Sequence, residues 1–145
     1  ENALGTYVIL TAFIPMIMGT GGNAGSQASV TVIRALSLEE IEFGDLIKVI
    51  WKELRISFFC GLTLAFCNFF KLMYFDKIAF DVSLVISITL VLTIFLAKAI
   101  GSILPIFAEK FKMDPAVMAS PLITTIVDAG SLMIYFKIAC MLLNI

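Results

Sequence analysis

The chain has 145 residues, of which 61% are hydrophobic and only 14% are charged, and its formal net charge is −1. Soluble domains carry about 25% charged residues, and a chain this short has too much surface to hide so many apolar side chains, so a soluble domain is excluded. The near-neutral charge, without a basic patch, also excludes nucleic acid as a partner. We therefore expect an all-α membrane protein in a lipid bilayer.

Four apolar segments are long enough to cross a bilayer, which takes about 20 residues of α-helix. They cover residues 3–33, 56–75, 82–107 and 121–145, with most charged residues gathered between them. This pattern predicts a single transmembrane domain over residues 1–145 and a multi-pass integral membrane protein. Because the chain begins with Glu1 rather than Met, we expect it to be part of a longer protein.

The first segment combines Pro15 with several glycines. Proline followed by glycines predicts a kinked or partly unwound helix, which a membrane tolerates only where the backbone is buried in protein or lines a cavity. The alternative is close packing between helices, because Gly21 and Gly25 form a small-x-x-x-small pair. The amide side chains of Asn23 and Gln27 lie four residues apart and share one face of this helix.

The connection between the first two segments contains an amphipathic stretch at residues 46–55. Its apolar residues lie on one side and Lys48, Lys52 and Glu53 lie on the other, which is typical of a helix lying in the membrane interface. Trp51 would then lie at the level of the lipid headgroups. A helix that binds a protein partner is the alternative.

Lysine and arginine are distributed unevenly among the connections, which predicts the orientation of the chain. The first and third connections have Arg34, Lys48, Lys52, Arg55, Lys110 and Lys112, whereas the second has Lys71 and Lys77. The first and third connections are therefore expected in the cytoplasm. Lys98 lies inside the third segment, and we expect its long side chain to reach toward the nearer membrane surface.

The fourth segment contains Asp128 among apolar residues. A carboxylate inside a bilayer costs about 2.5 kcal/mol or more, so it normally faces a partner, a cavity or an ion path. Thr124 and Ser120 precede Asp128 by four and eight residues and share its helical face, and Ser131 follows beside the same stripe. We therefore expect this polar stripe to be the functional part of the chain.

Carboxylate, hydroxyl and amide oxygens suit hard cations, above all Mg²⁺, which keeps most of its waters and needs one or two carboxylates. The candidate metal ligands are Asp128, Thr124, Ser120 and Asn23. One aspartate per chain is few, but a two-fold axis along the fourth segment would bring two copies together, and a divalent cation would offset their repulsion. An ion pair of Asp128 with Lys98 or Lys137 is the structural alternative.

Four motifs follow one another along the chain: PMIMGTGGNAGSQ at residues 15–27, TVIRAL at residues 31–36, DP at residues 114–115 and PLITTIVD at residues 121–128. Together they closely resemble the signature of the MgtE family of magnesium channels. The resemblance implies a homodimer with a pore on its two-fold axis, lined by the first and fourth segments. It also implies that Asp128 holds a largely hydrated Mg²⁺ and that the stretch around Thr124 contributes oxygen contacts.

Three features depart from the family pattern. Family members have five membrane helices, whereas four are visible here. They usually have cytoplasmic Mg²⁺-sensing domains ahead of the membrane part, and no such domain is present in this chain. The family often carries a polar amide where Ser120 supplies a shorter hydroxyl.

The sequence and the resemblance predict a Mg²⁺ channel or transporter for magnesium uptake across a bacterial inner membrane, and no enzyme. An intramembrane enzyme would need a histidine or a second carboxylate near Asp128, and the sequence provides neither. Two alternatives stay open. One is a secondary transporter that couples a divalent cation to Na⁺ or H⁺, and the other is a structural membrane subunit in which Asp128 is ion-paired.

Overall fold

The computed structural model describes residues 2–117 and 121–143 as four long α-helices and one short 3-10 turn. The helices are α1 (Asn2–Ser37), α2 (Leu46–Tyr74), α3 (Phe80–Lys110) and α4 (Pro121–Leu143), and the 3-10 turn η1 covers Phe43–Asp45. Each of the four α-helices is long and apolar enough to cross a membrane. The predicted all-α fold with four helices of membrane-spanning length is therefore confirmed.

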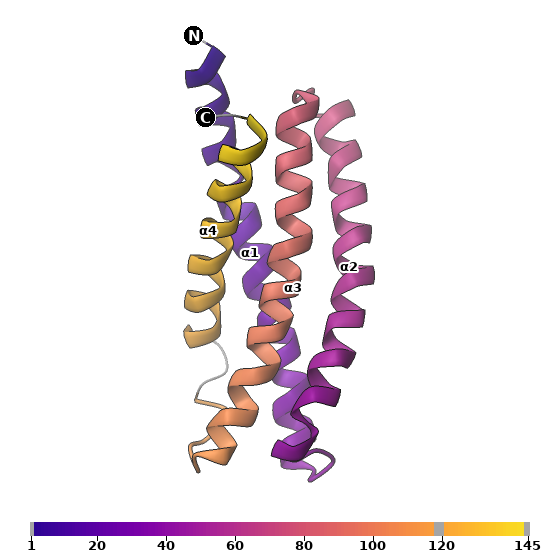
Figure 1. Ribbon diagram of the computed structural model, residues 1–145, viewed down its shortest axis with the longest axis vertical. Helices are drawn as coiled ribbons and strands as arrows, with labels where there is room; N and C mark the ends of the chain where they lie inside the picture. Colours follow the sequence, from indigo (N-terminus) through magenta and orange to yellow (C-terminus); the bar gives the residue numbers. More distant parts are fainter. Residues whose placement is uncertain (1, 118–120, 144–145) are drawn as a thin grey trace.

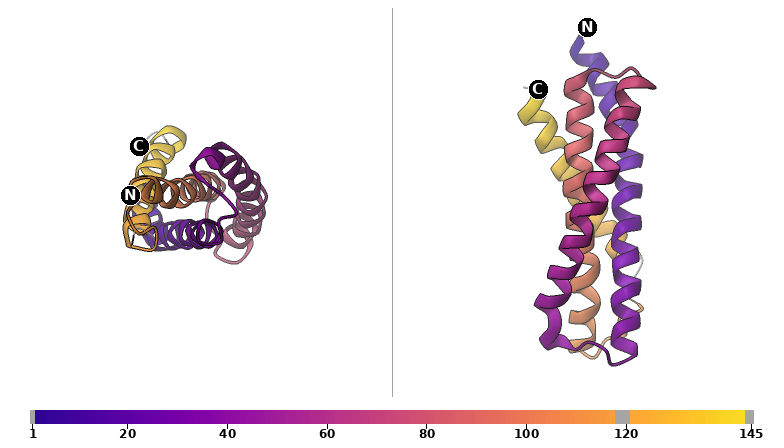
Figure 2. Two further views of the ribbon diagram at one scale, coloured as in Figure 1. Left: turned by 90° about the horizontal axis from the view of Figure 1, so that it is seen from below. Right: turned by 90° about the vertical axis from the view of Figure 1, so that its right-hand side faces the viewer.

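Helix α3 is the centre of the bundle and packs against α1, α2 and α4 (Figure 1). The apolar window of α3 is 56% buried, against 22–28% in the other three helices, so most of their surface faces outward. Helices α1 and α2 both lie along α3 but have little direct contact with each other. The chain reverses direction at each connection, so its two ends lie at the same end of the bundle (Figures 1 and 2).

A residue with left-handed backbone follows the end of each of the helices α1, α2 and α3 within three positions. These residues are Glu39 (φ 55°), Lys77 (φ 52°) and Lys112 (φ 56°). After the third of them, the backbone N–H of Met113 donates to the carbonyl of Ala108 at 2.9 Å, which satisfies a carbonyl at the helix end. Such endings let the chain turn back within a few residues and bring consecutive helices together.

Helix α1 runs without interruption through Pro15 and all its glycines. The prediction of a partly unwound backbone is therefore wrong, and the alternative of close packing is confirmed. A Cβ atom added to Gly101 of α3 would lie 2.2 Å from the carbonyl oxygen of Gly25 in α1. The backbones of the two helices touch there because neither residue has a side chain.

Residues 46–55 form the first part of α2, which continues without a break into the second span. The prediction of a separate interfacial helix is wrong, because no proline or glycine lies between Leu46 and Cys60 to end the helix. Trp51 is 62% exposed, and its position at the headgroup level stays a prediction. Glu53 is only 3% exposed, so it lies in the interior and not on the polar side predicted for it.

Candidate functional site

Asp128 lies on α4 next to Gly22 of α1. A Cβ atom added to Gly22 would lie 3.3 Å from Cγ2 of Thr124 and 3.9 Å from Oδ1 of Asp128. The missing side chain at Gly22 therefore lets the carboxylate approach the backbone of α1 closely. Asp128 is partly exposed, so the site is open on one side of the chain.

The rotation of α4 about its axis decides where Asp128 points. The buried face of α4 consists of Ile123, Val127, Ser131, Tyr135 and Ala139, which recur every four residues. Tyr135 anchors this face, since its buried hydroxyl donates a hydrogen bond of 2.9 Å to the carbonyl of Leu10 in α1. Asp128 follows Val127 and so lies about 100° around the helix, at the edge between the buried and the open faces.

Two of the predicted site residues, Asp128 and Thr124, are brought together beside Gly22. The hydroxyl of Thr124 donates to the carbonyl of Pro121 at 3.0 Å. Ser131 is placed differently from the prediction, because it is buried and its hydroxyl donates to the carbonyl of Val127 at 2.6 Å. Ser120, the third predicted ligand, lies outside the described residues.

Asn23, the remaining predicted ligand, lies on another side of α1. It is exposed and lines a groove of about 500 Å³ where α1, α2 and α3 meet. The polar residues of this groove are Thr20, Asn23, Gln27, Cys60 and Lys98. Within one chain, the structure therefore separates Asn23 from Asp128.

Lys98 is not the partner of Asp128. Its side chain is buried and its Nζ atom lies 3.4 Å from Oε2 of Glu53 in α2. The expected reach of Lys98 to the membrane surface is wrong for the same reason, since the residue is 5% exposed. Within residues 2–117 and 121–143, no ion pair involves Asp128.

No group of three histidine, cysteine, aspartate or glutamate side chains that could hold a metal ion occurs in the described part of the chain. At this position, one chain contributes the carboxylate of Asp128, with the side chain of Thr124 beside it. A cation here would therefore complete its ligand sphere with water or with groups from a second copy.

Sequence reasoning did not pair Glu53 with Lys98, although a signal for the pair existed. Lys98 lies in the middle of the most apolar span, where a lone cation is costly and normally has an acidic partner. Such a partner has to come from a neighbouring helix near the same depth. Which glutamate or aspartate this is depends on how the helices are arranged, which the sequence alone does not give.

Comparison with known proteins places the chain in a family. The MgtE family, described as a divalent cation transporter, matches residues 14–138. The magnesium transporter MgtE of Thermus thermophilus is 34% identical over 144 residues, covering 99% of this chain and 32% of that protein. The magnesium transporter MgtE of Bacillus subtilis is 39% identical over 143 residues, covering 96% of this chain and 31% of that protein.

The match covers nearly all of this chain but only part of each relative. The chain spans about a third of the length of each relative, since it covers 32% of one and 31% of the other. The matched part contains the four helices of membrane-spanning length. The chain is therefore an integral membrane protein, and it belongs to the MgtE family of divalent cation transporters.

Proposed function

We propose that this chain is the membrane part of a magnesium transporter, in which Mg²⁺ crosses a bacterial inner membrane through a pore at a homodimer axis. Asp128 binds the passing ion and selects for double charge, and Thr124 and Ser120 contribute oxygen contacts. The observation that carries this proposal is a carboxylate within a membrane helix, beside a glycine and without an ion pair among the described residues.

The chemistry of the site favours magnesium in particular. Mg²⁺ loses its waters reluctantly and is usually held by one or two carboxylates with several waters retained. Two Asp128 side chains facing each other across a two-fold axis would supply two carboxylates. Their repulsion would also favour a divalent cation between them over an empty site. Two relatives that cover nearly the whole chain carry the name magnesium transporter.

The direction of transport follows from the membrane potential. Moving one elementary charge across 100 mV is worth about 2.3 kcal/mol, so an inward potential favours the entry of a divalent cation by about twice that amount. The inward potential alone can therefore drive the proposed uptake, without a further energy source.

The test is Mg²⁺ flux into liposomes that contain the full-length protein to which this chain belongs. Asp128→Asn keeps the shape of the side chain and removes its charge. We expect it to lower Mg²⁺ flux at least tenfold, because the ion loses its principal charged ligand. Asp81→Asn is the matched control, since Asp81 is an exposed aspartate in the first turn of α3, and it should keep the flux of the wild type.

The dimeric state of each variant is measured alongside by cross-linking in the same liposomes. Wild-type flux in a dimeric Asp128→Asn variant would contradict the proposal. Flux that depends on an imposed Na⁺ or H⁺ gradient would replace the channel with a coupled secondary transporter. If Asp128→Asn lowers the amount of dimer but each remaining dimer carries wild-type flux, Asp128 is a structural residue.

A further inference from the structure

A buried lysine connects three helices of the bundle. The Nζ atom of Lys98 in α3 lies 3.4 Å from Oε2 of Glu53 in α2 and donates a hydrogen bond of 3.3 Å to Oε1 of Gln27 in α1. Lys98 is 5% exposed and Glu53 is 3% exposed. We call Lys98, Glu53 and Gln27 the Lys98 network. The network is separate from Asp128, and transport as proposed above does not use it.

Stabilisation of the fold does not by itself explain why the Lys98 network is present. Taking both charges out of water costs several kcal/mol per ion, and a buried ion pair offsets that cost only with excellent geometry. Here both contacts are longer than the 2.7–2.9 Å of a good charge-assisted hydrogen bond. Oε2 of Glu53 has no hydrogen-bond partner although it is buried. Apolar side chains of similar size would stabilise this place at least as well.

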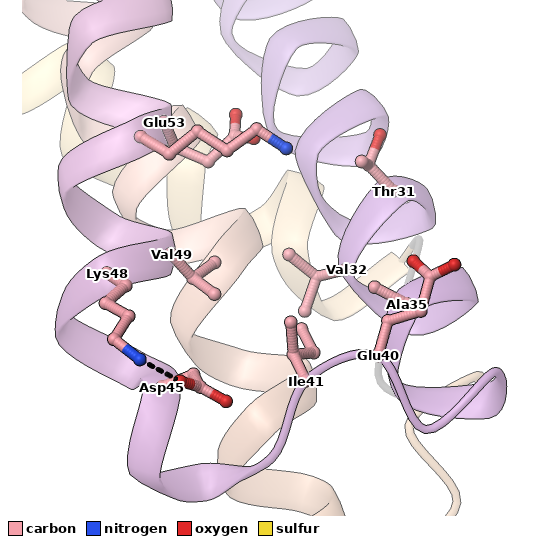
Figure 3. A pocket seen from close by; sticks show the side chains of 10 residues that line it. Thr31, Val32, Ala35, Glu40, Ile41, Asp45, Lys48, Val49 and Glu53 are labelled. Carbon is pink, nitrogen blue, oxygen red and sulfur yellow. Dashed lines mark hydrogen bonds and ion pairs between the residues drawn. The ribbon is translucent and has the colours of Figure 1, made fainter.

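The Lys98 network links α1 and α2, two helices that hardly touch each other. Helices α1 and α2 both pack on α3 with little direct contact between them. Residues of both helices line a groove between them. Glu53 projects into this groove from α2, and Thr31 of α1 stands across from it (Figure 3). Lys98 and Gln27 line a second groove, the one where α1, α2 and α3 meet. The ammonium of Lys98 therefore supplies a polar connection from α3 to both α1 and α2.

The part of α1 that the network holds is the part that faces Asp128. Gly25, two residues before Gln27, touches Gly101 of α3. A Cβ added to Gly25 would lie 3.2 Å from the carbonyl oxygen of Ala97, which precedes Lys98 in the chain. Gly22, less than one turn earlier in α1, lies beside Asp128. A shift of α1 relative to α3 at Gln27 would therefore change the distance between Gly22 and the carboxylate.

We propose that Lys98 and Glu53 are positioning residues for ion passage, which hold α1 on α3 so that Gly22 stays beside Asp128. This inference rests on the proposed function, because it assigns the network a role in the same ion path. The network acts through the placement of α1, and neither Lys98 nor Glu53 contacts the transported ion.

The first experiment separates positioning from stability. In the full-length protein, Lys98→Met/Glu53→Leu removes both charges and leaves neither one unpaired. We expect a dimer as heat-stable as the wild type with Mg²⁺ flux at least fivefold lower. Lys98→Arg, which keeps the charge and the donors, should retain flux within about threefold. Lys52→Met, at the exposed lysine next to Glu53, is the matched control and should change neither property.

The second experiment measures the placement of α1 without relying on flux. Spin labels at Thr31→Cys and Lys52→Cys lie on opposite walls of the groove, in a background where Cys60, Cys67 and Cys140 are replaced by alanine. We expect a narrow distribution of distances in the otherwise wild-type protein and a distribution at least twice as broad with Lys98→Met/Glu53→Leu. Labelled chains are mixed with an excess of unlabelled chains so that only distances within one chain count.

The two experiments can fail separately. An unchanged distance distribution would overturn the positioning role whatever the flux. Wild-type flux in Lys98→Met/Glu53→Leu would overturn it as well, provided that Asp128→Asn lowers flux in the same liposomes. If Asp128→Asn carries wild-type flux, the proposed function fails, and the distance measurement still decides whether the Lys98 network holds α1 in place.

Discussion

Gly22 sets how closely the backbone of α1 approaches the Asp128 carboxylate. An added Cβ would lie 3.3 Å from Cγ2 of Thr124, which is tighter than ordinary van der Waals contact, and 3.9 Å from Oδ1 of Asp128. A methyl group there would displace the neighbouring side chains by a few tenths of an ångström without opening the bundle. Gly22 is therefore a position where a small change alters the site and leaves the fold intact.

The substitution Gly22→Ala tests this. We expect a folded dimer with Mg²⁺ flux reduced three- to tenfold, because the methyl group narrows the space between α1 and the carboxylate. Gly19→Ala is the matched control in the same helix, since no atom lies within 4 Å of a Cβ added there. It should keep wild-type flux and gain about 0.5–1 kcal/mol of stability, because alanine favours helix over glycine. Equal flux in both variants would show that Gly22 does not shape the ion path.

The sequence allowed the position of Asp128 to be predicted but not the pairing of Lys98 with Glu53. A carboxylate in an apolar span is conspicuous by itself, and the four-residue spacing puts Thr124 on its face in any helix. A salt bridge between two helices depends on their neighbours, depths and rotations. Glu53 was expected on a polar face because the amphipathic pattern of residues 46–55 was interpreted for an isolated helix.

At the scale of elements, the contact between Gly25 and Gly101 brings α1 and α3 together. The carbonyl oxygen of Gly25 lies 2.2 Å from where a Cβ of Gly101 would stand. No flexible side chain can give way there, because the obstacle is the backbone of a continuous helix. An alanine at Gly101 can therefore be accommodated only by moving one helix away from the other.

We expect Gly101→Ala to lower the free energy of unfolding by about 2–3 kcal/mol. The measurement is thermal and chemical unfolding of the purified protein in detergent. Gly61→Ala is the matched control at the α2–α3 contact, where an added Cβ would lie 3.4 Å from Cα of Val91, an ordinary contact distance. It should unfold within about 0.5 kcal/mol of the wild type. Similar losses in both variants would contradict the special closeness of α1 and α3.

The number of helices could be predicted from the sequence, whereas the extent of α2 could not. Apolar length decides how many segments cross the membrane, because each span needs about 20 residues. The charged residues between 46 and 55 interrupt that signal but not the helix, since they are good helix formers with no proline or glycine among them. Hydropathy marks only the apolar part of α2, and the helix extends beyond that part toward Leu46.

At the scale of the whole molecule, α4 leaves most of its surface uncovered, as α2 does. It packs on α1 and α3 along one face, and α2 lies on the other side of α3 (Figure 1). Much of the outer face of α4 is apolar and exposed, including Leu122 (41%), Ile126 (38%) and Met133 (75%). Order along the chain does not say which helix is central, so this arrangement could not be predicted from the sequence.

The open face of α4 is where the proposed two-fold axis passes, and cross-linking tests that placement. Thr125 is exposed on α4, three residues before Asp128 and on the same side. In a background without native cysteines, Thr125→Cys should form a disulfide between two copies in the membrane, because residues next to a two-fold axis meet their own counterparts. The readout is the fraction of dimer on a non-reducing gel.

Thr63→Cys is the matched control, since Thr63 is also an exposed threonine whose hydroxyl donates to a carbonyl of its own helix. It lies on α2, across α3 from α4, so its two copies should stay apart and give less than about a tenth of the dimer. The reverse result, with cross-links at Thr63→Cys and none at Thr125→Cys, would place the interface on α2. Asp128 would then lie away from the axis, and two carboxylates could not share one ion.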